Sequence, residues 1–275
     1  MILSHPSEIS PDLRGSIMLL GNFDGFHRGH QHLLAFAQAK ARAEGRPLGA
    51  MSAEPHPRQF FAPDAAPFRL TCPITKHQTF RRSGFDFVFS PTFDADFACQ
   101  DPEEFVAAVL VNGLGVSRVV TGRNFRFGAR RSGDTRLLRE LGLRYGFTVS
   151  ELDELRVNDR ICGSSIIRQH IQAGDMAAAS ALLGYPWHVA LRITTASNPV
   201  EIAWPKHVLR PPPGSYGVAI RPSGDTLQHS PAILFLSEDS VADRLELSSA
   251  QQIIHDAAIS GLILAEFLPC PSRTV

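Results

Sequence analysis

Two histidines stand three residues apart in a glycine-rich segment near the start of the chain. The segment covers residues 21–31 and reads Gly-Asn-Phe-Asp-Gly-Phe-His-Arg-Gly-His-Gln, with the pair at His27 and His30. Residues spaced by three lie on one face of a helix, so both imidazoles can face the same bound group. In that position they can donate hydrogen bonds to phosphate oxygens as negative charge develops during phosphoryl or nucleotidyl transfer. The pattern therefore indicates phosphate chemistry.

This motif differs from the commonest phosphate-binding sequences. No Gly-Lys-Ser or Gly-Lys-Thr follows it, which excludes a Walker A loop, and the Gly-x-Gly-x-x-Gly pattern is absent. A histidine pair can also belong to a zinc site or to the protein core. The four cysteines form no C-x-x-C pair and no H-E-x-x-H occurs, so the sequence favours phosphate over zinc.

The flanking residues explain how the segment could hold an anion. An apolar run at 16–20 predicts a buried strand before it, and a helical pattern over 30–44 follows it. Gly21, Gly25 and Gly29 allow the backbone to approach a ligand closely. The helix that follows offers unpaired N–H groups and the positive end of its dipole to an anion.

Strand and helix patterns alternate through the first two thirds of the chain. Strands are predicted at 16–20, 47–53, 86–90, 117–121 and 147–151, and helices near 30–44, 73–83, 102–113, 134–145, 165–173 and 175–184. This alternation predicts an α/β fold with a parallel sheet and helices on both faces. Ligands of such sheets bind at the carboxyl ends of the strands, where the segment 21–29 lies.

Two later segments also contain residues that could bind a phosphate or a nucleotide. After the strand ending near residue 121, Asn124 can serve a phosphate or ribose, and Phe125 and Phe127 can pack on a planar ring. The arginines around them could equally form a solvated face. Further on, Ser164 and Ser165 open a helix with Arg168 one turn later. This segment is either an ordinary serine N-cap or a second phosphate-binding site.

The remaining residues change in character. Short apolar stretches, a Pro-Pro-Pro-Gly turn at 211–214, strand-like runs at 216–220 and 232–236 and one last helix near 249–259 predict a small β-rich domain. The sequence thus divides into a domain at 1–186 and a domain at 187–275.

Composition narrows the class of partner. The chain has 275 residues, is 44% hydrophobic and carries 27 basic and 27 acidic residues, for a formal net charge of zero. This balance gives no support for nucleic acid or a membrane surface as the main partner, and it favours small molecules. The start of the sequence has no signal-peptide pattern and no apolar run reaches 18 residues, so we expect a cytoplasmic protein with reduced thiols. Its oligomeric state cannot be read from the sequence.

Four motifs in order resemble a known family. The segment 21–31, Glu-Pro-His-Pro at 54–57, the stretch 122–128 and the stretch 164–168 are similar to the adenylyltransferase module of bacterial FAD synthetases, the bifunctional riboflavin kinase/FMN adenylyltransferases. The resemblance covers about residues 14–187. It implies a Rossmann-like nucleotidyltransferase domain that transfers AMP from ATP to FMN, giving FAD and pyrophosphate with Mg²⁺.

The resemblance also implies roles for individual residues. Catalytic roles fall to His27, His30, Asn124 and Arg168; ATP binding to Gly21, Asn22, Phe23, Asp24, Gly29, Ser164, Ser165 and Arg168; flavin binding to Pro55, Pro57, Phe60, Phe125 and Phe127. Mg²⁺ would be held mainly through the ATP phosphates, with no direct protein ligand. Phe60 could equally be a core residue.

The second half departs from the family pattern. The Gly-x-Pro-Thr-Ala-Asn segment of the kinase module is absent; only 193–198 faintly echoes it, and the phosphate loop before it is missing. Glu246 could take the place of the kinase carboxylate, although an exposed strand residue is the simpler interpretation. We therefore expect a degenerate kinase-like barrel without riboflavin kinase activity. Two alternatives stay open: a nucleotidyltransferase for another phosphate ester or a modified flavin, and a noncatalytic flavin or nucleotide binder.

Overall fold

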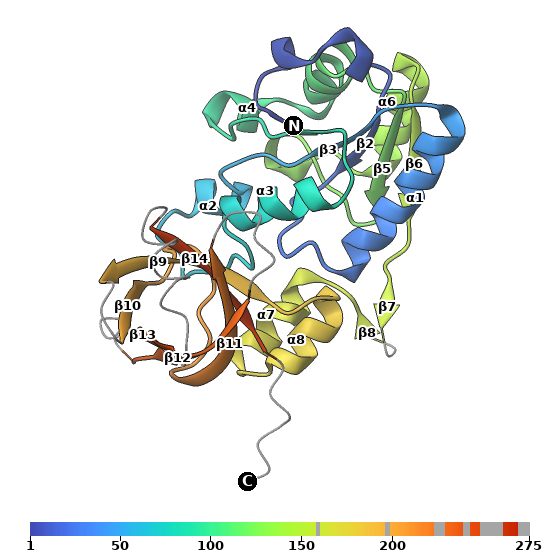
Figure 1. The fold of residues 1–275 in the computed structure, drawn as a ribbon. Helices are drawn as coiled ribbons and strands as arrows, with labels where there is room; N and C mark the ends of the chain where they lie inside the picture. Colours follow the sequence, from blue (N-terminus) through green and yellow to red (C-terminus); the bar gives the residue numbers. More distant parts are fainter. Residues whose placement is uncertain (158–159, 196–198, 223–228, 239–242, 248–260, 269–275) are drawn as a thin grey trace. The chain divides into compact units, whose positions relative to one another are not determined.

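The chain folds into two compact units, each described here by itself. A computed structural model describes residues 1–157, 160–195, 199–222, 229–238, 243–247 and 261–268. The first unit comprises residues 1–65 and 77–161, and the second comprises 66–76 and 162–275 (Figure 1).

The first unit contains a six-stranded parallel sheet with the strand order β1-β4-β3-β2-β5-β6. The strands are β1 (Ile2–Leu3), β2 (Ile17–Leu20), β3 (Leu48–Met51), β4 (Phe87–Phe89), β5 (Arg118–Gly122) and β6 (Thr148–Leu152). Strands two to six in this series confirm the five strands predicted from the apolar runs. A small hairpin, β7 (Arg156–Val157) with β8 (Arg160–Ile161), follows the sheet.

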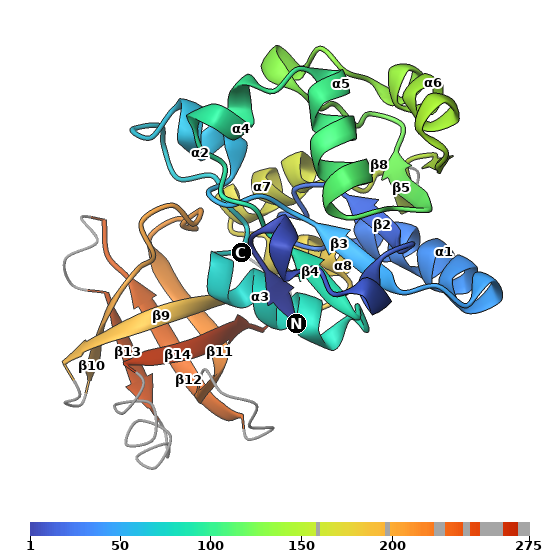
Figure 2. The same cartoon turned by 90° about the horizontal axis from the view of Figure 1, so that it is seen from above.

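Helices connect the strands on both faces of the sheet. They are α1 (Arg28–Glu44), α2 (Pro57–Phe61), α3 (Pro73–Arg82), α4 (Ala95–Cys99), α5 (Pro102–Glu104), which continues into π-helical turns over Phe105–Gly113, and α6 (Thr135–Tyr145). Single 3-10 turns lie at Pro6–Glu8, Pro11–Leu13 and Ala129–Arg131. Figure 2 shows α1 and α3 on one side of the sheet and α5 and α6 on the other.

Burial on both faces explains why β2 is apolar throughout. Ile17 and Leu19 pack with α1 residues in one core cluster, whereas Met18 and Leu20 pack in a second cluster with the helical turns after α5 and with α6. Successive side chains of a strand point to opposite faces, so a central strand covered on both sides must be apolar at every position. All four residues of β2 are indeed buried.

The strand order places a switch point beside β2. From β2 the chain moves to β3 and β4 on one side and then returns to β5 on the other side. Helices and loops leave such a sheet in opposite directions at this point, which opens a crevice at the carboxyl ends of the two strands. Gly21 after β2 and the residues after Gly122 in β5 meet at this edge.

The second unit combines two helices with a closed antiparallel barrel. The helices are α7 (Ser164–Gln172) and α8 (Met176–Leu183). The barrel order is β10-β13-β12-β11-β14-β9, with β9 (His188–Thr195), β10 (Val200–Ala203), β11 (Gly214–Pro222), β12 (Ser230–Leu236), β13 (Arg244–Leu247) and β14 (Leu262–Phe267) (Figure 2). The expected barrel is confirmed. The helix predicted near 249–259 lies outside the described residues.

The compact units do not coincide with a division at residue 186. Segment 66–76 belongs to the second unit because its backbone carbonyls accept hydrogen bonds there: Leu70 from the Trp187 indole at 2.9 Å and Phe68 from the Arg168 guanidinium at 2.7 Å. Helices α7 and α8 also fall in the second unit. The sequence pattern groups them with the α/β elements of the domain at 1–186. No helix in the described residues has the length and apolar content that a membrane crossing requires.

Candidate active site

The turn after β2 is held in an unusual backbone conformation by two buried rings. Phe23 and Phe26 have positive φ angles of 49° and 36°, and Gly25 between them has a φ of 86°. Both phenylalanine rings are buried and pack edge-on against Phe80, each with a centroid distance of 5.7 Å. A non-glycine residue with positive φ is strained and persists only where packing enforces it. The core therefore fixes the turn that carries the histidines.

His27 and His30 come together as the sequence predicted. His27 is the N-cap residue of α1, and His30 lies in its first turn. Their rings stack with centroids 3.8 Å apart and planes inclined by 21°. The Phe23 ring also packs edge-on against the His30 ring, with a centroid distance of 5.1 Å. The two imidazoles thus form one unit whose orientation is set by the core.

The surroundings of His30 keep it neutral. Burial lowers the pKa of His30 well below its ordinary value, and the neighbouring His27 charge lowers it further. Its Nδ1 atom is enclosed and finds no hydrogen-bond partner among the described residues. A neutral imidazole can still donate one hydrogen bond, and an approaching phosphate favours its charged form. Next to the free N–H groups at the start of α1, the pair suits an anion.

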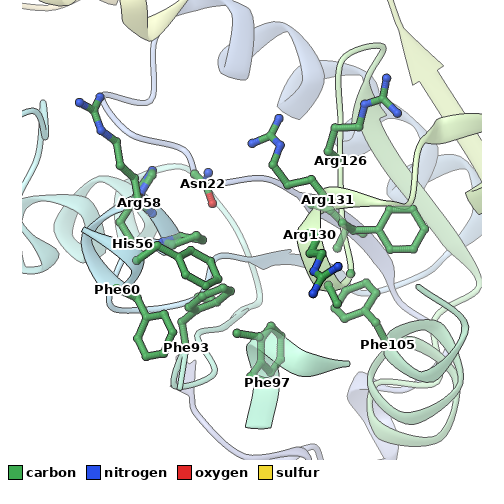
Figure 3. Close-up of a pocket in the computed structure, with 18 of the residues that line it drawn as sticks. Asn22, His56, Arg58, Phe60, Phe93, Phe97, Phe105, Arg126, Arg130 and Arg131 are labelled. Atoms are coloured by element: carbon green, nitrogen blue, oxygen red, sulfur yellow. Dashed lines mark hydrogen bonds between the residues drawn. The ribbon is translucent and has the colours of Figure 1, made fainter. Parts of the chain in front are cut away.

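A large aromatic cavity opens beside this turn, entirely within the first unit. Its volume is about 1140 Å³. Seven phenylalanines contribute to its lining: Phe60, Phe61, Phe93, Phe97, Phe105, Phe125 and Phe127. Figure 3 shows Phe60, Phe93 and Phe97 gathered in the cavity, with Phe105 on the neighbouring helix. Such a lining suits a planar, mostly apolar ring system.

The cavity is also positively charged. Arg58 lines it on the α2 side, while Arg126, Arg130 and Arg131 line it from the segment after β5 (Figure 3). No Asp or Glu occurs among the lining residues. An aromatic cavity edged only by cations suits a planar ligand that carries an anionic group.

Most of the predicted flavin-side residues line this cavity. Pro57, Phe60, Phe125 and Phe127 do so, and Phe125 and Phe127 lie nearly parallel, with centroids 5.8 Å apart. Pro55 is not among the lining residues, although its neighbour His56 is. Gly21 and Asn22, predicted to bind ATP, also line the cavity. The histidine turn and the aromatic cavity therefore share two residues.

Four other predicted residues lie outside the set of cavity-lining residues. The Phe23 ring is in the core, so only its backbone is available to a nucleotide. The Asp24 side chain is also buried, while Gly29 lies in the first turn of α1. Asn124 is exposed, and its amide donates a 2.5 Å hydrogen bond to the carboxylate of Glu154. It does not line the cavity.

Ser164, Ser165 and Arg168 belong to the second unit. Gly163 is the N-cap of α7, so the two serines occupy the first two helical positions instead of capping the helix. The Arg168 Nε donates to the Phe68 carbonyl, and its guanidinium lies 5.7 Å from the Phe68 ring centroid. In the barrel, Glu246 is exposed on β13 and pairs with Arg244 at 3.7 Å.

Several lining residues escaped the sequence reading. Phe61, Phe93, Phe97 and Phe105 carry no local signal, because an isolated phenylalanine in a helix or a loop looks like a core residue. For the arginines at 126, 130 and 131 the sequence leaves two interpretations open: a solvated face, or part of a ligand-binding segment that is rich in glycine and phenylalanine. No acidic residue occurs from 106 to 133, which is the charge pattern that accompanies them.

Comparison with known proteins identifies the family of this chain. The FAD synthetase family model matches residues 9–166, more than half of the chain. The chain belongs to the FAD synthetase family. The resemblance noted in the sequence is thereby confirmed.

Curated members of this family align over the same region. The bifunctional riboflavin kinase/FMN adenylyltransferase of Escherichia coli (strain K12) is 36% identical over 179 residues, which are 65% of this chain and 57% of that protein. The corresponding protein of Pseudomonas fluorescens is 38% identical over 67% of this chain and 59% of its own length. The match thus spans less than three fifths of these relatives.

A solved structure resembles the whole chain. A crystal structure described as a macrolide-efflux protein from Streptococcus pneumoniae superposes with a TM-score of 0.79, covers 98% of both chains and is 20% identical. At this identity the likeness establishes the fold alone. It supports the combination of a parallel α/β sheet and a closed barrel in one chain.

Proposed function

We propose that this member of the FAD synthetase family is an FMN adenylyltransferase, which transfers the AMP group of ATP to FMN and releases pyrophosphate. The observation that carries the proposal is the sharing of Gly21 and Asn22 between the histidine turn and the aromatic cavity. A flavin ring in the cavity would place its phosphate toward the turn where the ATP phosphates are expected to bind.

The transfer of AMP to FMN does not need a strong general base. The second pKa of a phosphate monoester is about 6, so FMN is largely dianionic near neutral pH. One of its phosphate oxygens attacks the α-phosphorus of ATP, a new P–O bond forms, and the bond from the α-phosphorus to the bridging oxygen breaks. Pyrophosphate takes that oxygen and its electron pair. Positioning and charge neutralisation are therefore the tasks left to the protein.

The stacked histidines fit the second task. His27 and His30 are assigned to the phosphates of ATP, where their N–H groups stabilise the charge that builds up at the α-phosphorus. The N–H groups at the start of α1, including that of Gly29, add a fixed positive potential. Asp24 and the Phe23 backbone shape this turn. Asn124 serves phosphate once its bond to Glu154 is exchanged for one to the substrate.

The family resemblance assigns Ser164, Ser165 and Arg168 to ATP binding. At the start of α7 the two serines and the Arg168 guanidinium offer hydroxyls, helix N–H groups and a positive charge. The hydrogen bond from Arg168 to the Phe68 carbonyl fixes the orientation of its guanidinium.

The divalent metal of the reaction is assigned to the ATP phosphates, with Mg²⁺ as the ion. Within the described part of the chain, no three His, Cys, Asp or Glu side chains gather into a metal-binding group. We therefore assign the metal ligands to the phosphate oxygens of ATP. A bound Mg²⁺ would neutralise part of the charge on those oxygens. The histidines would donate hydrogen bonds to the phosphate oxygens of the nucleotide.

The test is a pyrophosphate-release assay across acceptors. Purified protein with ATP and Mg²⁺ is given FMN, riboflavin, nicotinamide mononucleotide or glycerol phosphate, and FAD is measured by chromatography. We expect FAD and pyrophosphate in equal amounts with FMN and no release with the other acceptors. Release with another ester but not with FMN would assign a different nucleotidyl transfer. Binding of FMN and ATP without turnover would assign a noncatalytic binder.

A further inference from the structure

Two adjacent arginines at the cavity edge have no carboxylate partner within the part of the chain that the structure describes. Arg130 and Arg131 are exposed, and neither forms an ion pair with any described residue. Arg126 differs, because its guanidinium lies 3.6 Å from Asp134. Figure 3 shows Arg130 and Arg131 across the cavity from Arg58. Two uncompensated positive charges thus stand where a ligand would enter.

Their backbone is strained. Arg130 has φ 54° and ψ 22°, and Arg131 has a φ of 58°. This left-handed region favours glycine, so consecutive arginines in it store conformational energy. Both side chains leave the same short loop and line the cavity, and backbone strain of this kind is often found at ligand-binding sites.

The loop is fixed at both ends. Phe127 and Gly133 exchange two backbone hydrogen bonds, of 3.1 and 2.9 Å, which close the loop between them. The Ala129 N–H donates to the Gln100 carbonyl at 2.7 Å, and the Ser132 hydroxyl donates to the Ala129 carbonyl at 2.8 Å. The guanidiniums therefore extend from a fixed base next to the Phe127 ring.

We propose that Arg130 and Arg131 are specificity-determining residues that hold the phosphate of the acceptor, so that the site selects a phosphorylated planar ring over its dephosphorylated form. This inference rests on the proposed function and adds residues that recognise the acceptor. The phenylalanines bind the ring alike in both forms, and only the phosphate distinguishes them. Guanidiniums bind phosphate by paired, charge-assisted hydrogen bonds.

The test uses the double variant Arg130→Gly/Arg131→Gly. Glycine adopts the left-handed conformation without strain, so the fold is retained and the thermal midpoint does not fall. Binding of FMN, riboflavin and ATP is titrated separately, the flavins by quenching of their fluorescence. We expect the Kd of FMN to rise about 10-fold or more, while the Kd values of riboflavin and ATP change less than about 3-fold.

Two further variants sharpen the result. Arg130→Lys/Arg131→Lys keeps the charges and should restore part of the FMN preference. Arg136→Ala removes an exposed arginine of α6 that pairs with Glu140 at 2.7 Å and does not line the cavity. It should leave the ratio of FMN to riboflavin affinity unchanged.

The possible outcomes separate the two proposals. Equal weakening of FMN and riboflavin, or no change in either, would overturn the role of the arginines and leave the adenylyltransferase standing. Weakening of ATP alone would assign the guanidiniums to nucleotide phosphates and also overturn the inference. If the wild-type protein binds neither flavin, the proposed function fails, and that result is visible before any variant is made.

Discussion

The imidazole rings of His27 and His30 lie stacked at the start of α1, with their centroids 3.8 Å apart. Two rings at this distance oppose simultaneous protonation, since like charges in contact repel. A phosphate bound to the pair would relieve that repulsion. We therefore expect the charge state of the two imidazoles to change when a nucleotide binds.

Replacement of His30 by alanine should lower kcat for FAD formation by roughly 100-fold or more, because a donor at the developing charge is lost. The Kd of FMN should change little, since His30 does not line the aromatic cavity. His32→Ala is the matched control, because His32 is exposed in the same helix. A His30→Ala enzyme with wild-type kcat would remove this residue from catalysis.

His30 should also make the protein sensitive to mild acid. The pKa of His30 is lowered in the folded protein by burial and by the His27 charge. In the unfolded chain an imidazole takes up a proton as the pH falls through about 6.5. The unfolded state then binds more protons than the native state, so the free energy of unfolding falls as the pH drops below about 6.5 toward the lower native pKa.

Urea unfolding at steps between pH 7 and pH 5 checks this expectation. The free energy of unfolding of His30→Gln should fall less steeply with decreasing pH than that of the wild type. Other groups, such as the carboxylates, contribute equally to both proteins and cancel in the difference. Parallel curves for the two proteins would show that His30 titrates normally in the fold.

Gly133→Ala should disturb the flavin cavity through Phe127. A Cβ atom on Gly133 would lie 2.8 Å from the Phe127 ring, so the ring must move. We expect the Kd of FMN to rise about 10-fold with little change for ATP, as one wall of the cavity is displaced. Gly217→Ala in β11 is the control, because a Cβ there meets nothing within 4 Å. Unchanged FMN binding in Gly133→Ala would remove Phe127 from the flavin site.

The barrel is predicted to lack riboflavin kinase activity. The sequence has no Gly-x-Pro-Thr-Ala-Asn segment, and Glu246 is exposed and paired with Arg244. Incubation with riboflavin, ATP and Mg²⁺ should therefore yield neither FMN nor ADP, while the same preparation converts FMN to FAD. Chromatographic detection of FMN from riboflavin would contradict this prediction.

The sheet could be predicted from sequence because its strands are short apolar runs between turns. The run at 16–20 followed by Gly21 located β2 within one residue. Helices α2 and α4 were not predicted, because five residues are too few to show a 3.6-residue period. The attachment of 66–76 to the second unit rests on tertiary hydrogen bonds such as that from Trp187 to Leu70, which no local pattern encodes.

The candidate site was predictable only in part. The histidine pair and the Phe125–Phe127 pair are visible because spacing within one segment sets their geometry. Phe93, Phe97 and Phe105 reach the same cavity from different turns of the chain, so only the fold brings them together. The positive φ angles of Arg130 and Arg131 are likewise a property of the folded loop.

The most direct test of the account is a crystal structure of the protein with FMN and a non-hydrolysable ATP analogue. We predict the α-phosphate of the analogue within hydrogen-bond distance of the His27 and His30 rings and the flavin ring between the phenylalanines of the cavity. A nucleotide bound away from both imidazoles, or a flavin bound outside that cavity, would contradict it.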